Sequence, residues 1–575
     1  MNRRSMFTNV FGQNTSLQKQ VSASALPVAG GLTPYNGVWD FAAASHLLRR
    51  ACFGASYAQI NQAVTDGLLK TMTNLLAAKD LTKVPLPSPP VNPVYANDPD
   101  VPIGATWVSA PSGVGDNLIQ QYRQNSVRAW SFELMYSEQI SLREKMTLFW
   151  HNHFVTADTP DPRLEYKYLN TIRENALGNF KTLTKSMTID PAMLLYLNGN
   201  QNTSKAPNEN YARELLELFT IGKGDLAGPG DYTTFTEVDV AAIAKCLTGW
   251  KIPNLRNATN LNAVFPVAPI TGLNPDHDYN DKTLSHRFNN FVVKTPLTNN
   301  KKDGIKEYEY LIDEVIFNVK KADAAKFLAT KLYRYFVYYK IDSNIESEII
   351  NGLAQRLIAD NFEVAGTLSL LLSSEHFYSD AAFGAMVQSP LEFIFHNIKS
   401  IGFTPPTTLS EKYAYFLDMW RNGLNFQQGY LEHPSVAGWS AYYQEPSFHE
   451  IWISSATLPL RMSLTQNYVN KTARVRNVTG TIGFDLVAYI QKFQEPSDIN
   501  KLIDSIVQHL LPRPIQQNQI DALKEALLQG NPDYEWKVEY EAYVARPSNT
   551  TRMVIDTRLK RLFNLLLAMP ENYLI

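Results

Sequence analysis

Apolar residues recur at helical spacing along most of this chain, and this periodicity constrains its fold more than any other feature. After Asp40, the residues Phe41, Ala44, Leu48 and Ala51 line one face of a predicted helix. Similar patterns return up to the C-terminus, without the fixed period that a solenoid of equal repeats requires. The sequence therefore predicts a mainly α protein, a large irregular globule of many helices.

Several segments depart from this pattern and divide the chain. Residues 1–36 are polar and are expected to form a flexible N-terminal arm, and residues 83–103 form a linker too rich in proline to be helical. Residues 251–305 are dominated by Asn, Pro, Asp and Gly, which predicts a mostly non-helical insertion with short strands. We expect a main helical domain over 37–470, containing this linker and insertion, and a C-terminal helical region over 471–575 packed on it.

Charge and composition exclude several classes of partner and scaffold. The chain has 53 basic and 55 acidic residues, so it lacks the basic field that collects nucleic-acid phosphates. No stretch approaches the ~20 consecutive apolar residues of a transmembrane helix. Two cysteines, Cys52 and Cys246, are too few for a disulfide scaffold. Two buried free thiols are the favoured interpretation, with a single bridge as the alternative.

The first residues leave the compartment open. Arg3 and Arg4 resemble the paired arginines of an export signal, but polar residues interrupt the apolar segment that such a signal needs. The protein is expected in the cell envelope or outside the cell if this start is a signal remnant or if a partner carries the signal. It is expected in the cytoplasm if the Arg3-Arg4 start is not a working signal.

The first candidate site is the H-x-H pair of His151 and His153. On a strand such a pair can chelate one metal ion, whereas on a helix two alternate residues lie about 200° apart and cannot reach the same ion. A joint site therefore requires the helix to end near His151. The alternative is a structural role for both histidines.

The second candidate site is a polar stripe on a helix predicted over 208–220. Arg213, Glu214 and Glu217 share this stripe, with Glu209 at its start. One interpretation is a solvated face held by Arg213–Glu217 pairing. The other is a pair of carboxylates that hold a divalent cation or share acid–base duties.

The third candidate site is the segment DHDYNDK within the insertion, which contains His277, Asp278 and Lys282. This composition suits a turn and an oxygen-rich cation site equally well. The nucleophile elbow GxSxG, the phosphate loop, the dinucleotide fingerprint and HExxH are all absent from the sequence. Ordinary serine hydrolases, nucleotide-binding proteins and zincins are therefore excluded.

The segments that carry these residues resemble, in order, a bacterial family catalogued as domain of unknown function 1800. The resemblance covers nearly the whole chain, and FWHNHF and NENYAREL are its most specific parts. It rests on HLLRRACFG (46–54), LREKMTLFWHNHF (142–154), DPAMLLYL (190–197), NENYARELLELFTIG (208–222), DVAAIAKCLTGW (239–250), HD (277–278), KLYRYFV (331–337), HPSVAGW (433–439) and MPENYLI (569–575).

The resemblance implies a helical protein without an established activity. Genes of the family often accompany those of an exported family with a sulfatase-like appearance, which implies a co-encoded exported partner. The resemblance also changes how the polar residues of these segments are weighed. Because burying ionisable groups costs several kcal/mol each unless they pair or bind a ligand, we expect four of these segments to meet at one internal polar site.

The function that the sequence favours is hydrolysis at this site, dependent on one divalent metal. The metal would lower the pKa of a bound water toward ~7, a carboxylate would act as general base, and cations would stabilise anionic charge. The expected metal ligands are His151, His153, His277 and Asp278, and the expected catalytic residues are Glu209, Glu214, Arg213 and Lys282.

Two alternatives stay open at this point. A non-catalytic envelope scaffold or export partner would use the polar cluster only to fix helix register, and would form a stable complex with the co-encoded protein. A carbohydrate-binding protein would stack sugars on the aromatic side chains of Trp439, Tyr442, Tyr443 and Trp452, which otherwise serve as packing around a loop.

Overall fold

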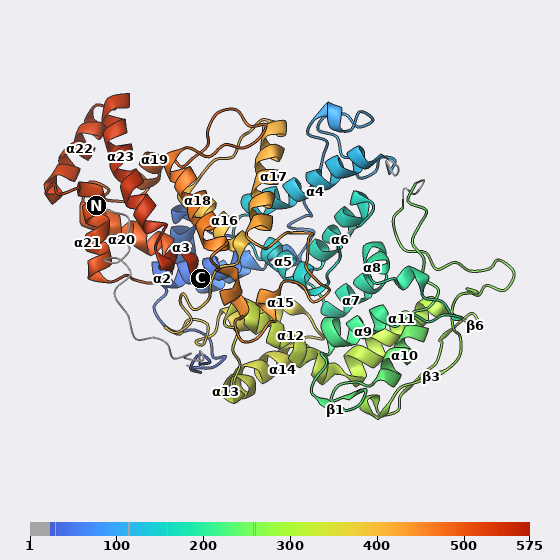
Figure 1. The fold of residues 1–575 in the computed structure, drawn as a ribbon. Coiled ribbons are helices and arrows are strands. Elements are labelled where there is room, and N and C mark those ends of the chain that lie inside the picture. The colour runs from blue at the N-terminus through green and yellow to red at the C-terminus, as the bar shows by residue number, and fades with distance from the viewer. Residues whose placement is uncertain (1–23, 29, 113–115, 158, 257, 259) are drawn as a thin grey trace.

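A computed structural model describes residues 24–575 of the chain, except 29, 113–115, 158, 257 and 259. The fold is mainly α, as predicted (Figure 1). Within the described residues the strands are two or three residues long and form three separate antiparallel hairpins. These are β1 (Leu226–Gly228) with β2 (Asp231–Tyr232), β3 (Lys282–Thr283) with β4 (Val292–Val293), and β5 (Leu297–Thr298) with β6 (Lys301–Lys302).

The first helices begin where the sequence places their caps. Helix α2 (Phe41–Ala51) starts after Asp40, whose carboxylate accepts a hydrogen bond from the amide of Ala43. Helix α3 (Tyr57–Leu75) starts after Ser56, which forms a capping box with Gln59. The helix predicted after Asp40 therefore begins where the sequence places it.

The centre of the molecule is built around α5 (Arg143–His153), which packs against α6 (Pro162–Glu174). Every residue of α5 except Asn152 is buried, including its charged ones. Glu144 is paired with Arg173 of α6 at 2.8 Å, and Lys145 is paired with Glu392. Helices α4 (Asn117–Ser137), α7 (Phe180–Thr188) and α8 (Pro191–Tyr196) complete this central layer.

The helix predicted over 208–220 changes its geometry part-way. It starts as α9 (Asn210–Glu214) and continues as the π-helix η4 (Leu215–Thr220), which ends before Gly222 at a φ of +75°. The wider turn of the π-helix departs from the predicted α-helix. The apolar spacing of LLELFT fits both geometries, so the sequence did not distinguish them. The next helix, α10 (Glu237–Cys246), begins with a capping box formed by Thr236 and Asp239.

The insertion is mostly non-helical, as predicted, and lies at the opposite end of the molecule from the C-terminal helices (Figure 1). After it the chain returns to helices that pack side by side, with α12 against α14 and α17 against α4. These helices are α11 (Gly304–Tyr310) with the π-helix η6 (Leu311–Val319), α12 (Lys321–Phe336), α13 (Ser343–Ile345) with the π-helix η7 (Glu346–Ile350), α14 (Asn351–Ala359), α15 (Val364–Leu372), α16 (Pro390–Ile401) and α17 (Leu409–Asn425).

The C-terminal helices contact the first ones, so the two ends of the described chain meet (Figure 1). Helix α20 contacts α2 and α16, and α23 contacts α18. The predicted boundary at 470/471 stays a prediction. The helices of this part are α18 (Thr457–Asn470), α19 (Leu486–Ile490), α20 (Ile499–Leu510), α21 (Gln517–Leu528), α22 (Asp533–Ala545) and α23 (Asn549–Leu566).

Part of the predicted N-terminal arm is in contact with the helical body. The amide of Tyr35 donates to the carbonyl of Ser373 at 2.8 Å, and the ring of Tyr35 lies 4.2 Å from that of Tyr378. Arg3 and Arg4 lie outside the described residues. No helix in the described part of the chain is long and apolar enough to span a membrane. Cys52 and Cys246 are buried free thiols.

Candidate functional site

The H-x-H pair lies on a helix, because α5 continues to His153 instead of ending near His151. His151 is buried, and both of its ring nitrogens are hydrogen-bonded within the protein. Its Nδ1 lies 2.9 Å from the hydroxyl of Tyr168, and its Nε2 accepts from the amide of Leu431 at 3.1 Å. His151 therefore connects α5 to the loop that follows α17.

The neighbour of His151 anchors the other end of the same loop. Asn152 Oδ1 accepts a hydrogen bond from the amide of Trp439 at 2.9 Å. The close approach requires glycine at position 438, where φ is +86° and a Cβ would lie 2.2 Å from Asn152 Oδ1. Two consecutive residues of α5 thus fix the loop of residues 431–439.

His153 has a different set of partners from His151. Its Nε2 lies 2.8 Å from the carbonyl oxygen of Phe219, so this nitrogen carries a proton and donates it. Its Nδ1 is therefore an acceptor in the neutral ring, and Lys331 Nζ lies 3.2 Å from it. Burial, with a smaller contribution from Lys331, holds the pKa of His153 well below its usual range.

The polar stripe of α9 lies near the surface. Arg213 pairs with Glu237 of α10 through two contacts of 2.7 and 2.6 Å, and more weakly with Glu209 at 3.5 Å. The predicted Arg213–Glu217 pair is replaced, since Glu217 is paired with Lys223 at 3.0 Å. Glu214 is half-buried, and burial, with a smaller contribution from Glu217, raises its pKa.

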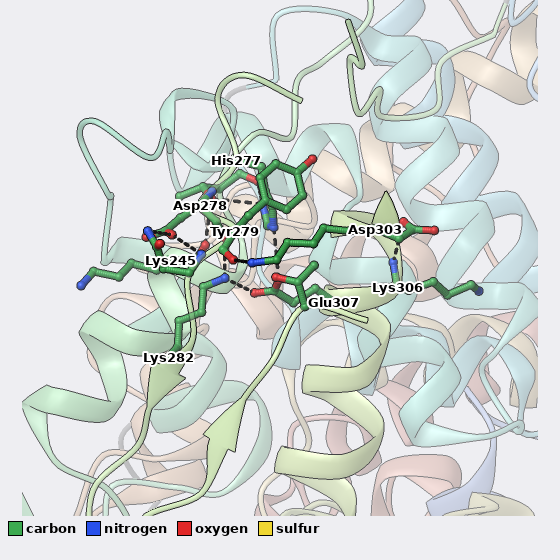
Figure 2. A network of polar contacts seen from close by, with 12 residues as sticks. Lys245, His277, Asp278, Tyr279, Lys282, Asp303, Lys306 and Glu307 are labelled. Carbon is green, nitrogen blue, oxygen red and sulfur yellow. Dashed lines mark hydrogen bonds and ion pairs between the residues drawn. The ribbon is translucent and has the colours of Figure 1, made fainter. Parts of the chain in front are cut away.

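The third candidate segment forms a buried ionic network with a residue that the sequence did not single out. Figure 2 shows the carboxylate of Glu307 between Lys282 and His277. His277 Nε2 lies 3.3 Å from Glu307, whose side chain is fully buried, and its Nδ1 lies 2.8 Å from the carbonyl oxygen of Thr248. The Asp278 carboxylate instead accepts from Asn280 in its own turn, at 2.8 Å. This network attaches the insertion to α11.

The eight residues expected at one metal site are thus distributed over separate places. His151 and His153 engage different partners, Glu209 and Arg213 lie at the surface, and His277 and Lys282 belong to the Glu307 network. In the part of the chain that the structure describes, no group of three or more His, Cys, Asp or Glu residues is arranged to hold a metal ion. The expected convergence of these eight residues is therefore not observed, and metal binding stays a prediction.

The predicted aromatic surface is also mostly inaccessible. Trp439 and Trp452 are 2% and 4% exposed, and the ring of Trp439 lies 4.1 Å from that of His433. Of the four residues only Tyr443 is exposed. Sugar stacking on this set is not supported, because two of its rings are packing residues.

Four of the motif segments do meet, at a cavity of about 290 Å³. We call it the Lys331 cavity. Its apolar walls come from Phe149, Phe327, Tyr335, Tyr442 and Tyr443. Its other lining residues are Asn152 and His153 from 142–154, Glu217 and Leu218 from 208–222, Lys331 and Arg334 from 331–337, Ala437 from 433–439, and Thr330.

Lys331 is the polar group that distinguishes this cavity. Its Nζ donates to the carbonyl of Leu218 at 3.0 Å and to His153 Nδ1 at 3.2 Å, and lies 4.7 Å from the centre of the Phe327 ring. No carboxylate of the described residues forms an ion pair with it, although 290 Å³ of open space adjoins it. Burial lowers the pKa of Lys331 to about 7, with a smaller contribution from Arg334.

Arg334 lies one helical turn after Lys331 on α12 and lines the same cavity. Its Nε donates to the carbonyl of Tyr339 at 3.1 Å, and its nearest carboxylate partner is Glu445 at 4.0 Å. The Glu445 side chain is 75% exposed, so this contact is screened by solvent and weak. The cavity therefore combines aromatic walls with two cations that lack a strong counter-ion in the described part of the chain. The one carboxylate in its lining, Glu217, is paired with Lys223.

A larger cavity of about 450 Å³ lies between α2 and α20, but its chemistry is less distinctive. Arg49 at its wall donates to the carbonyls of Leu510 and Leu511 at 3.1 and 3.2 Å. This cation is already committed to the end of α20. The Lys331 cavity is therefore the better candidate site.

A sequence model of a family described as a protein of unknown function (DUF1800) matches residues 46–574, nearly the whole chain. The chain belongs to this family. No curated protein and no solved structure matches it. The family supplies a shared sequence pattern without an activity, so function has to be argued from the site. The compartment and the co-encoded partner stay predictions.

Sequence reasoning missed Lys331 although it singled out His153. In the sequence Lys331 is one polar position of an amphipathic helix, like the exposed Lys326 five residues earlier. The available signal was the segment KLYRYFV, which carries part of the family resemblance and begins with this lysine. Its proximity to His153 is a tertiary contact across 178 residues and cannot be read from spacing.

Proposed function

We propose that the protein binds a small organic anion with an apolar or aromatic body in the Lys331 cavity. The observation that carries this proposal is Lys331 itself, an amine at the wall of a 290 Å³ cavity. Within the described residues its hydrogen-bond partners, His153 and the carbonyl of Leu218, are both neutral. Lys331 is half-buried, and withdrawing a cation from water is costly unless it is paired. An anionic ligand supplies the missing charge.

The walls of the cavity indicate the rest of the ligand. Phe149, Phe327 and Tyr443 offer ring faces and edges, which favour a flat apolar body. Arg334 provides a planar guanidinium, which suits a carboxylate better than a single amine does. Metal-dependent hydrolysis is less well supported, because the residues expected to bind the metal do not converge.

The test measures the binding of 4-methylbenzoate to the protein by saturation-transfer difference NMR. We expect Arg334→Gln to weaken binding by about 1.5–3 kcal/mol, the value of a hydrogen bond to a charged group. Lys331→Met should weaken it as well. Lys326→Met is the matched control, because Lys326 is exposed on the same helix and paired with Glu346. Equal binding by all four proteins, or none by the wild type, would contradict the proposal.

A further inference from the structure

We infer that Lys331 is a nucleophile that forms an imine with the carbonyl carbon of an aldehyde or ketone bound in the Lys331 cavity. This inference rests on the proposed function and names its substrate class. A neutral amine has two N–H groups and one lone pair. Here two acceptors are in place, the carbonyl oxygen of Leu218 at 3.0 Å and His153 Nδ1 at 3.2 Å. Both N–H groups are then occupied, and the lone pair is left for an electrophile.

The acceptor role of His153 follows from its other nitrogen. Because Nε2 donates to the carbonyl of Phe219 at 2.8 Å, Nδ1 of the neutral ring has no proton and cannot donate to Lys331. His153 is buried and its ring is held between Phe149, Trp150 and Phe154, so the opposite orientation is not accessible without repacking. His153 is a positioning residue for the amine.

Ordinary lysines are poor nucleophiles at neutral pH because they are protonated. Burial brings the pKa of Lys331 to about 7, so at pH 7 about half of these side chains are neutral amines. An exposed lysine with a pKa near ~10.4 is neutral in roughly one molecule in a few thousand. Desolvation in an apolar pocket is a known way to activate a lysine toward carbonyl compounds.

The reaction balances without an oxidant or reductant. The lone pair of Nζ forms a bond to the carbonyl carbon while the C=O π electrons move to oxygen. The two amine protons are transferred to that oxygen, with His153 Nδ1 adjacent to relay them. The C–O bond then breaks, water leaves, and a C=N bond joins Lys331 to the ligand. Arg334, three residues after Lys331 on α12 and in the lining of the same cavity, supplies a guanidinium for a carboxylate of the carbonyl compound.

The experiment uses 4-carboxybenzaldehyde as probe and sodium cyanoborohydride to trap the imine in the full-length protein at pH 7. Intact-mass and peptide mapping then locate the adduct, which adds the probe less one oxygen atom. We expect one adduct per chain, at Lys331, formed on the order of tenfold or more faster than at any other lysine. Lys331→Arg should lose it, and Lys326→Arg should retain it. The wild-type map alone is decisive should Lys331→Arg fail to fold.

Binding of 4-methylbenzoate separates this inference from the proposal beneath it. That compound has the same carboxylate and ring but no carbonyl group. If it competes with the probe while no Lys331 adduct forms, the binding proposal stands and the imine inference is overturned. If neither compound binds, both fail. Labelling spread evenly over surface lysines also overturns the inference, because it shows that Lys331 has no special reactivity.

Discussion

At the scale of single residues, the ionisable side chains that are buried or half-buried differ in how their charge is compensated. Lys282 faces Glu307, Lys145 faces Glu392, and Arg173 faces Glu144. Lys331 faces a carbonyl and a neutral histidine, and no carboxylate of the described residues pairs with it. Charges that are paired with an opposite charge fix structure. An amine without a charged partner, beside open space, is the kind of group expected at a functional site.

The stability of the protein should report the neutral amine of Lys331. Its folded pKa, about 7, lies below the ~10.4 of an unfolded lysine, so between these values the unfolded chain binds the extra proton. The free energy of unfolding therefore rises with pH across this window, relative to Lys331→Met. Urea denaturation of both proteins from pH 6 to 10 measures the difference. If the free energies of unfolding of the two proteins change with pH in parallel, Lys331 is an ordinary lysine. The control variant Lys326→Met should follow the wild type.

Breaking the Glu307 network should be far more costly than removing an exposed ion pair. Glu307→Gln leaves the Lys282 ammonium buried opposite an amide, and we expect a loss of about 3–5 kcal/mol in the free energy of unfolding. The double variant Glu307→Gln/Lys282→Met should lose less than the sum of the single variants, because it removes both charges. Additive losses in denaturant titrations would show that the two residues do not interact.

At the scale of elements, α5 organises the candidate site through three consecutive side chains. His151 and Asn152 hold the loop of residues 431–439, and His153 positions Lys331 of α12. The π-helix η4 supplies the carbonyl oxygens of Leu218 and Phe219 to the same two groups. Helices α5 and α12 and the π-helix η4 thus meet at one amine, and Ala437 of the loop lines the cavity beside it, so motif segments distant in sequence share a cavity.

The loop can be tested at Gly438. We expect Gly438→Ala to cost about 2 kcal/mol or more, because φ is +86° and the new Cβ would collide with Asn152. Gly480→Ala is the matched control, since its φ is +79° but nothing lies within 4 Å of the added atom, and it should cost about 1 kcal/mol. Thermal unfolding and hydrogen exchange of residues 431–443 measure both. Equal costs would show that the contact with Asn152 contributes nothing.

Helix starts and fold class were predictable because local chemistry determines them. Asp40, Ser56 and the Thr236–Asp239 box cap helices as their side chains predict. Partners distant in sequence were not predictable. Glu307 lies 25 residues from Lys282, and His153 lies 178 residues from Lys331, so no spacing rule connects them. The sequence predicted that buried polar residues need partners, and these residues have them. The partners lie in separate networks and not at the single shared site that we expected.

At the scale of the whole molecule, buried arginines connect parts far apart in the chain. Arg49 of α2 donates to the carbonyls of Leu510 and Leu511 at the end of α20, and to His396 Nε2 at 2.9 Å. Its positive charge also complements the C-terminal end of α20. Arg50 donates to the carbonyl of Val337 at the end of α12, at 3.2 Å. The paired arginines of HLLRRACFG therefore join the first helix to the middle and the end of the protein.

Replacing Arg49 should loosen the C-terminal helices as a unit. Arg49→Met leaves several buried acceptors without a donor, at about 1–3 kcal/mol each, so we expect a loss of at least about 3 kcal/mol. Limited proteolysis should then cut within 499–566. Arg552→Met is the control, since its pair with Asp485 is exposed and should contribute below about 1 kcal/mol. A stable variant with an unchanged cleavage pattern would contradict this role.

The central claim is that the Lys331 cavity is the ligand site of this protein. The most direct measurement is a crystal soaked with 4-bromobenzoate, in which anomalous scattering locates the bromine atom. The account predicts a peak beside Phe149, Phe327 and Tyr443, with the carboxylate at Lys331 and Arg334. A bromine peak in the larger cavity between α2 and α20, with the Lys331 cavity empty, would contradict it.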